Sequence, residues 1–232
     1  MTVCGVLFVL VAAIRLANAD ALKEARVSQV IQDVRLLEAH GAPHPAAVND
    51  KVIFGSAVRT GVESRAELTF NDLTITRLGA NTIFSFTAGA RQAELTQGTI
   101  LLQVRQNAPP VRANTTAVTV AVMGGTAMLS TGPPAKFMVL EGIGNIYPLG
   151  HPEKAVTVHA GEMVLAEGGR VNKPEKFDVK AVLATSPLVV DFAPLANLPL
   201  ILTVVDQQQA EQQVMVSNPP PYKSSFDTID VT

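Results

Sequence analysis

The sequence predicts an all-β fold, either a β-sandwich or a short β-solenoid, followed by a short C-terminal helical appendage. Strand-like segments follow one another from residue 66 to residue 159, separated by Gly, Asn or Asp, with no helical period between them. Apolar residues take up helical spacing only after residue 178. The chain has 232 residues, of which 47% are hydrophobic and 16% charged, so it can form a sizeable core. This composition excludes an intrinsically disordered chain.

The predicted strands are short and rich in β-branched and aromatic residues. The first of them, residues 66–70, alternates apolar and polar side chains, which places Ala66, Leu68 and Phe70 on one face. We expect Leu68, Phe70, Val118, Val120 and Val158 to point into the core. The strand pattern recurs at residues 74–78, 82–86, 99–104, 117–122, 137–140 and 155–159.

Two helices are predicted in the appendage. Asp178 has the residue type and position of an N-cap for a first helix that Pro187 ends. A second helix begins near Pro199 and ends in the Gln-rich stretch 207–213. We expect its apolar face to dock on the β-domain, because so short a helix is not stable alone.

The chain therefore divides into four predicted segments. These are a signal peptide over residues 1–19, a β-domain over 20–170, the helical appendage over 171–216 and a Pro-rich polar tail over 217–232. The tail has little to bury, and we expect it to be extended or disordered.

The first residues predict the compartment. An apolar run over residues 6–14 precedes an A-x-A processing site, which predicts cleavage between Ala19 and Asp20 and a periplasmic or secreted protein. Residues 1–5 contain no Lys or Arg, so either the amino terminus alone supplies the positive charge or the true start lies upstream. The single cysteine, Cys4, would leave with the signal, which excludes disulfides from the mature chain. No later run is long enough to predict a membrane span.

Charge and aromatic content exclude some partners. Eighteen Lys and Arg against 20 Asp and Glu give a net charge of -2, too balanced for a protein that binds nucleic acid by neutralising phosphates. The chain has no Trp and only 2 Tyr, which argues against a platform that stacks on sugars or bases.

The histidines are candidate metal ligands by residue type, and we expect no cofactor or metal. His40 and His44 have the spacing of a helical zinc pair, but Gly41 and Pro43 break any helix that would align them, so a solvated loop is predicted. No motif of a hydrolase, metalloprotease or nucleotide-binding enzyme occurs, and no catalytic residue is assigned.

A second histidine lies in a sequence that faintly resembles the metal motif of cupins. His159 is followed by Glu162, but the second histidine of that motif would stand at position 157, where the chain has Thr157. A surface pair at a strand edge is therefore favoured over a metal site.

An ordered set of short motifs resembles the FecR domain, the extracytoplasmic sensing module of bacterial iron-uptake signalling proteins. The resemblance covers roughly residues 48–167. Its motifs are GSAVRTG at 55–61, SRAELTFND at 64–72, RLGANT at 77–82, LxxG at 95–98, TAV at 116–118 with GT at 125–126, VLEG at 139–142 and VxVxAGE at 156–162.

This sequence departs from the family pattern at two turns and in its architecture. Leu73 follows Asp72 where the family usually has glycine, so we expect that hairpin to be distorted or one residue longer. Met123 and Gly124 stand where a basic residue commonly precedes the Gly-Thr pair. In the family that this chain resembles, relay members have a cytoplasmic segment that a membrane helix joins to this domain. Here a predicted signal peptide comes first. The resemblance therefore implies the fold and an interaction role more than ferric-siderophore signalling.

We expect a non-enzymatic, secreted or periplasmic FecR-like module that binds another protein of the bacterial envelope. Strand addition at an exposed sheet edge is one physical route to such a partner. An alternative is a carbohydrate- or polymer-binding surface module, and a third hypothesis is a cupin-like metalloenzyme that uses His159 and Glu162.

Overall fold

We describe the fold from a computed structural model. It describes residue 22, residues 24–87 and residues 91–217. The predicted signal peptide, its cleavage site and the Pro-rich tail after residue 217 lie outside the described residues.

The predicted all-β fold is confirmed, because the described strands join into one 17-stranded sheet that curls back on itself. The sheet is built around a long central hairpin of β12 (Val118–Ser130) and β13 (Ala135–Pro148). The sequence predicted only a part of each of these two strands. The first half of β12 pairs with β11 (Val111–Asn114), and its second half pairs with β10 (Thr99–Val104). The long hairpin thus belongs to two layers.

Each layer grows outward from this hairpin by neighbouring strands. Beyond β10, the first layer continues with β7 (Ile75–Leu78), β6 (Arg65–Phe70), β1 (Glu24–Ile31) and β4 (Lys51–Ile53). Beyond β11, the second layer continues with β9 (Gln92–Gln97), β8 (Ile83–Thr87), β5 (Ala57–Thr60), β2 (Val34–Leu37) and β3 (His44–Pro45). All of these pairs are antiparallel except β9 with β11.

Short strands complete both layers on the far side of β13. The first layer gains β15 (Glu162–Glu167), which pairs in turn with β16 (Arg170–Val171) and β17 (Glu175–Lys176). The second layer gains β14 (Val156–His159), which follows the 3-10 turn η1 (Pro152–Lys154). Residues 171–178 of the predicted helical appendage therefore include strand residues.

Two facing glycines bend the long hairpin. Gly125 lies opposite Gly142, and the register shifts beside them. Gly125 has a φ of +118°, and a Cβ there would lie 2.1 Å from the backbone oxygen of Glu141. A Cβ on Gly142 would lie 2.1 Å from the backbone oxygen of Gly124. Only glycine fits at both positions, so the bend between the layers is fixed by this pair.

The main hydrophobic core lies between the two layers. Phe70 of β6 and Phe86 of β8 meet edge to face there, with ring centroids 5.1 Å apart. The predicted inward residues are confirmed, because each is at most 2% exposed; they are Leu68, Phe70, Val118, Val120 and Val158. Alternation along short strands therefore predicted the core correctly.

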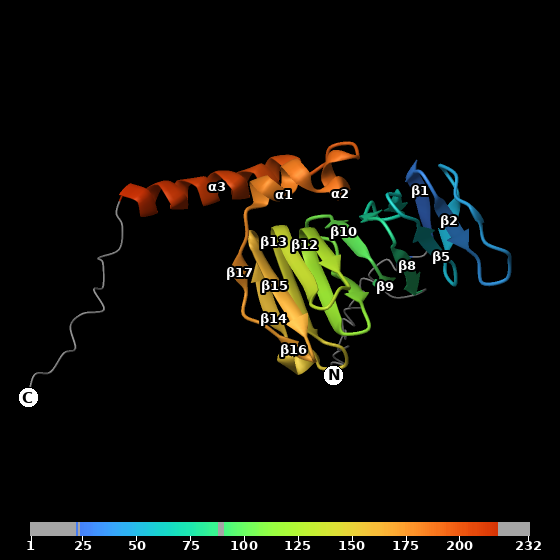
Figure 1. Ribbon diagram of the computed structural model, residues 1–232, viewed down its shortest axis with the longest axis horizontal. Helices are drawn as coiled ribbons and strands as arrows, with labels where there is room; N and C mark the ends of the chain where they lie inside the picture. The colour runs from blue at the N-terminus through green and yellow to red at the C-terminus, as the bar shows by residue number, and fades with distance from the viewer. Residues whose placement is uncertain (1–21, 23, 88–90, 218–232) are drawn as a thin grey trace, which may run out of the picture.

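Three helices cover the outer face of the first layer (Figure 1). These are α1 (Val179–Thr185), α2 (Pro187–Val190) and α3 (Leu198–Ser217). The Asp178 carboxylate accepts a hydrogen bond from the Ala181 backbone N–H at 2.9 Å, which confirms the predicted N-cap. Pro187 ends α1 as predicted and begins α2.

A second hydrophobic cluster joins these helices to the sheet. It combines Leu101 and Leu140 of the sheet with Leu188, Ile201 and other helix residues, which confirms the predicted docking of the appendage. The last helix is longer than expected, since it continues through the Gln-rich stretch to Ser217 and projects past the sheet (Figure 1). Among the described residues, no helix is both long and apolar enough to cross a membrane.

Candidate functional site

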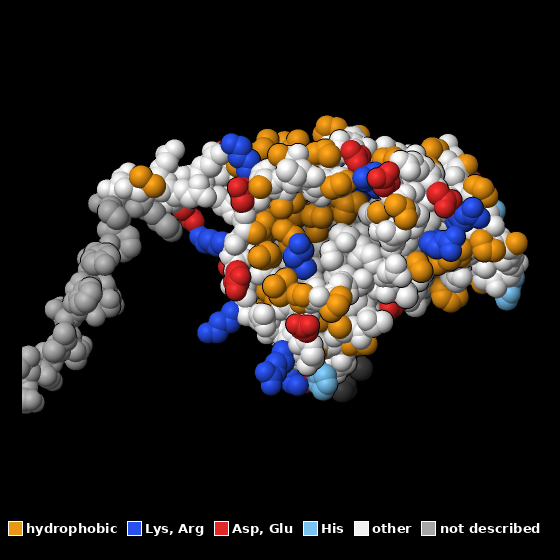
Figure 2. All heavy atoms as spheres, viewed as in Figure 1, with side chains coloured by type: hydrophobic (Ala, Val, Ile, Leu, Met, Phe, Trp, Pro, Cys, Tyr) orange, Lys and Arg blue, Asp and Glu red, His pale blue; other side chains and the backbone are white. Residues whose placement is uncertain are grey.

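A groove of about 510 Å³ opens between the outer face of the first layer and the start of α3. One wall comes from β6, β7, β10 and the turns beside them, and the other comes from the connection into α3. Figure 2 shows hydrophobic side chains along the junction between the helices and the sheet. The residues that line the groove are Thr69, Leu73, Ile75, Gln103, Val104, Arg105, Gln106, Glu141, Ala196, Asn197, Pro199 and Leu200.

Two leucines contribute exposed apolar surface to the groove. Leu73 is 58% exposed and Leu200 is 46% exposed, although both are large hydrophobic side chains. Leu200 lies in the first turn of α3, where its neighbour Ile201 is fully buried in the cluster beneath the helix. The first turn of α3 therefore exposes Leu200 at the groove and buries the next residue, Ile201, against the sheet.

Leu73 has a left-handed backbone, with a φ of +65°. It closes the β6–β7 turn, in which the Leu73 N–H donates to the Phe70 carbonyl and the Phe70 N–H donates to the Thr74 carbonyl. The Asp72 carboxylate accepts from the Thr74 N–H at 2.9 Å. This conformation suits glycine and is unfavourable for leucine. The expected distortion of this hairpin does not occur, because β6 and β7 pair without a register shift and Leu73 itself adopts the left-handed conformation that glycine would take.

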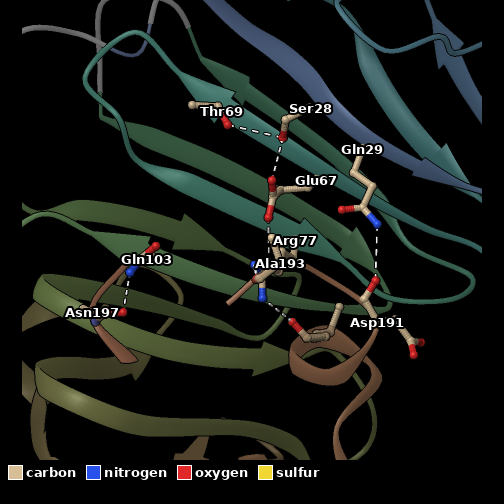
Figure 3. Close-up of polar contacts among 10 residues, drawn as sticks. Ser28, Gln29, Glu67, Thr69, Arg77, Gln103, Asp191, Ala193 and Asn197 are labelled. Carbon is tan, nitrogen blue, oxygen red and sulfur yellow. Dashed lines mark hydrogen bonds and ion pairs between the residues drawn. The ribbon is translucent and has the colours of Figure 1, made fainter. Parts of the chain in front are cut away.

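The floor of the groove is polar and hydrogen-bonded. Asn197 accepts a hydrogen bond from the Gln103 side chain, as Figure 3 shows. Its amide donates to Thr126 Oγ1 at 2.7 Å and to a Glu141 carboxylate oxygen at 2.6 Å. Gln106 donates to the other Glu141 oxygen at 2.7 Å. The buried carboxylate of Glu141 is therefore held by two amide donors.

Asn197 also starts α3. Its backbone carbonyl accepts from the N–H groups of Leu200 and Ile201, while its side chain binds the sheet. One residue therefore fixes both the beginning of the helix and its position over the sheet.

A buried arginine holds the helical connection beside the groove. Arg77 of β7 is 1% exposed, and its Nε lies 2.8 Å from a carboxylate oxygen of Glu67. Its terminal nitrogens donate to the backbone carbonyls of Leu188 at 3.0 Å and Ala193 at 2.5 Å. Its guanidinium carbon lies 4.7 Å from the centre of the Phe192 ring.

Figure 3 shows this polar chain running from β1 to the helices. Thr69 donates to Ser28 at 3.3 Å, and Ser28 donates to Glu67 at 2.8 Å. Gln29 donates to the backbone oxygen of Asp191 at 3.2 Å. The Asp191 carboxylate also pairs with Arg65 at 3.0 Å. These contacts fix the segment between α2 and α3, which forms one wall of the groove.

The mouth of the groove carries one exposed cation. Arg105 is exposed and forms no ion pair with any residue that the structure describes. The nearby Asp72 carboxylate is paired with Arg91 at 2.5 Å, and Glu141 is buried among amides. The accessible charge at the groove is therefore positive.

The first two histidines do not form a site. His44 lies in the short strand β3 and no helix joins it to His40, as predicted from Gly41 and Pro43. The ring of His44 hydrogen-bonds the Pro45 carbonyl at 3.1 Å and Glu38 at 3.4 Å. The Pro45 carbonyl, followed by the Glu38 carboxylate, raises the pKa of His44 above its ordinary value.

The cupin-like pair lies in the β14–β15 hairpin. The Glu162 carboxylate accepts from the backbone N–H of His159 at 2.8 Å, so it closes the turn of its own hairpin. Over residues 24–87 and 91–217, no group of three or more His, Cys, Asp or Glu residues is placed to hold a metal ion.

Five glycines fall between alternating segments of the sequence, where a turn or bulge favours positive φ; they are Gly61, Gly79, Gly98, Gly142 and Gly161. Gly98, Gly142 and Gly161 have positive φ values, as predicted. For Gly61 and Gly79 the prediction was wrong, because neither adopts positive φ. A Cβ on Gly61 would lie 3.2 Å from the Asp33 carboxylate, and one on Gly79 would lie 3.3 Å from a backbone oxygen. Close packing, rather than turn conformation, accounts for these two glycines.

Sequence reasoning assigned no site residue and therefore missed the groove. Leu73 had a signal, because leucine stood where the resembled family usually has glycine. Leu200 had none, since it follows the pattern of an ordinary helix start. The two walls come from distant parts of the chain, and only the docking of α3 brings them together.

Comparison with known proteins finds two partly similar solved structures. Two crystal structures of a "putative anti-sigma factor" from Parabacteroides distasonis ATCC 8503 are similar to this chain, at 17% and 20% identity and TM-scores of 0.48 and 0.47. Each match covers 55% of this chain and spans 63% and 62% of the respective crystal chain. No curated protein matches the sequence.

The family match falls on the strands that build the centre of the sheet. The family model described as FecR protein matches residues 56–143, from the start of β5 into β13. The motif set of the sequence and the all-β fold agree with this match. The chain therefore contains a FecR domain over residues 56–143.

Proposed function

We propose that this protein is a non-enzymatic interaction or sensing module of the bacterial envelope, and that the groove beside α3 is where it binds another envelope protein. The observation that carries the proposal is a groove of about 510 Å³ that two exposed leucines line over a polar, hydrogen-bonded floor. The FecR domain supports the signalling context.

The chemistry of the groove suits a protein partner. Fully burying a leucine side chain is favourable by about 1.5–3 kcal/mol. Leu73 and Leu200 are each about half exposed, so covering them in a complex contributes about 1 kcal/mol or more each to the binding free energy. The floor is already satisfied by its own hydrogen bonds, so a partner can cover it without leaving a polar group unpaired. Exposed apolar side chains beside hydrogen-bonded polar groups are also found in protein interfaces.

We also propose secretion, with cleavage between Ala19 and Asp20. The first described and buried residue, Leu22, and strand β1 both follow that position, so cleavage leaves the described fold intact. The intact mass of the protein recovered from envelope fractions tests this. A chain that begins at Asp20 supports the proposal, and an uncleaved chain in the cytoplasmic fraction contradicts it.

Site-specific cross-linking in the native bacterium tests the proposed binding. A photo-reactive amino acid replaces Leu200 in the groove, and a matched control replaces Val62, which is 73% exposed in the turn at the opposite end of β6 from Leu73. We expect a discrete cross-linked envelope protein at position 200 and none at position 62. Equal patterns at both positions would contradict a binding role for the groove.

A second candidate function is carbohydrate or polymer binding, and one observation favours it. Strand register places Ser85, Glu94, Asn114, Thr119 and Tyr147 in one row across the outer face of the second layer. However, Asn114 donates to Glu94 at 3.0 Å and Thr119 donates to Asn114 at 2.9 Å, so mutual bonding already explains the row. Binding on a glycan array that Asn114→Ala abolishes would favour this function.

A further inference from the structure

We propose that the groove recognises a short, extended segment of its partner in which an apolar side chain is flanked by acidic residues. Leu73 and Leu200 hold the apolar side chain, and Arg105 pairs with a carboxylate. This inference rests on the proposed function and deepens it, because it assigns the chemistry of the partner.

The strained backbone of Leu73 is the first support. Its φ of +65° belongs to a region that glycine adopts freely and leucine rarely does. The fold gains little in return, because the side chain is 58% exposed instead of packed in either hydrophobic core. Unfavourable conformations without a packing reward are typical of functional sites. A contact with a partner supplies the reason for a leucine at this turn.

The charge at the mouth is the second support. Arg105 lines the groove and forms no ion pair within the described part of the chain. Of the acidic groups at the groove, Glu141 is buried and accepts from two amides, and Asp72, next to Leu73, pairs with Arg91. The groove therefore attracts a negatively charged segment and repels a positively charged one.

The dimensions favour a linear segment over a folded surface. A volume of about 510 Å³ accepts a few side chains, which is within the range of roughly 300–1,000 Å³ for ligand pockets. Residues in the first turn of α3 form one wall and the β6–β7 turn forms the other, so an extended segment can lie between them.

Random peptides displayed on phage are the probe for this proposal. Selection on the wild-type protein is expected to enrich peptides with Leu, Ile, Val or Phe next to Asp or Glu. The enriched peptides are then synthesised, and their Kd values are measured by fluorescence anisotropy against the wild type and three variants. The variants are Leu73→Gly, Arg105→Glu and, as a control outside the groove, Val62→Gly.

Leu73→Gly separates binding from folding. Glycine relieves the left-handed backbone, so the variant is expected to melt at or above the wild-type temperature. It is expected to bind the peptides about tenfold more weakly, as for loss of an interface hot spot. Val62→Gly should leave the Kd unchanged. Unchanged peptide binding by Leu73→Gly overturns the proposal.

Arg105→Glu tests the charge by reversal. The variant is expected to bind the acidic peptides with a Kd about tenfold or more higher than that of the wild type. It is expected to bind more tightly than the wild type to versions in which Lys replaces the acidic residues. Loss of both peptide versions, or no change in either, overturns the role of Arg105. Rescue by the reversed peptide cannot arise from a merely structural effect.

The outcomes distinguish this inference from the function on which it rests. A groove cross-link at position 200 without enrichment of acidic apolar peptides leaves the proposed function standing and overturns the inference. Enrichment of basic or purely polar peptides overturns it also. If sedimentation velocity instead shows a dimer that Leu73→Gly dissociates, the groove binds a second copy of the chain and the inference is wrong.

Discussion

Arg77 is the position where one substitution tests how the helices are held on the sheet. Its guanidinium is buried, pairs with Glu67, and donates to two backbone carbonyls in the segment that leads to α3. Arg77→Met keeps an apolar stem of similar length and removes the charge and every donor. The variant leaves Glu67 and both carbonyls without these partners while disturbing the packing little.

The contacts set the expected magnitude. Removing one partner of a buried ion pair costs about 3–5 kcal/mol, because the other charge stays buried and unpaired. Glu67 still accepts from the Ser28 hydroxyl at 2.8 Å, so part of its hydrogen bonding remains. We therefore expect Arg77→Met to lower the free energy of unfolding by about 3 kcal/mol, the lower end of that range.

Urea denaturation measures this loss, and a double variant assigns its cause. Glu67→Gln removes the unpaired charge, so Arg77→Met combined with Glu67→Gln should be more stable than Arg77→Met alone. Relative to the wild type, hydrogen exchange should accelerate more in α2 and the segment after it than in β12, because the lost contacts join Leu188 and Ala193 to the sheet. A loss of free energy below about 1 kcal/mol with unchanged helix protection would refute this reasoning.

Three further predictions concern the core, the bend and one titrating group. Leu68→Ala should lower the free energy of unfolding by about 2–5 kcal/mol in urea denaturation, because the side chain is fully buried. Gly125→Ala should abolish soluble folded protein, since the added methyl lies 2.1 Å from a backbone oxygen of β13, whereas Gly168→Ala points into open space and should remain folded by circular dichroism. In an NMR titration the pKa of His44 should lie above its ordinary value, and Glu38→Gln should lower it, because the protonated ring then loses the hydrogen bond that it donates to the Glu38 carboxylate.

Local patterns predicted several of the strands, β6 among them, and the reason is physical. Alternation in β6 places Leu68 on the inner face whatever strand pairs beside it, because successive side chains point to opposite faces. The N-cap at Asp178 is equally local, since its acceptor lies within one turn of its donor. The bend of the long hairpin was not predictable in this way. Gly125 matters because it meets Gly142, and that meeting depends on the register of two strands.

The burial of Arg77 was hidden from the sequence for a related reason. It alternates with buried side chains along β7, so the sequence places it on the outer face, where arginine is ordinarily solvated. The helices cover that face, and Phe192 and the carbonyl of Ala193 enclose the guanidinium. Tertiary packing, and not the strand pattern, decides whether an outward charge meets water.

The groove depends on parts of the chain inside and outside the FecR match. Leu73 and Arg105 fall within residues 56–143, whereas Asn197 and Leu200 belong to the helical layer. Asn197 binds Gln103 and Glu141 of the FecR domain, so the sheet positions the start of α3 and thereby one wall of the groove. A change that loosens the helices must therefore open or remove the groove as well. Arg77→Met should weaken peptide binding even though Arg77 does not line the groove, which links the stability of the helical layer to recognition.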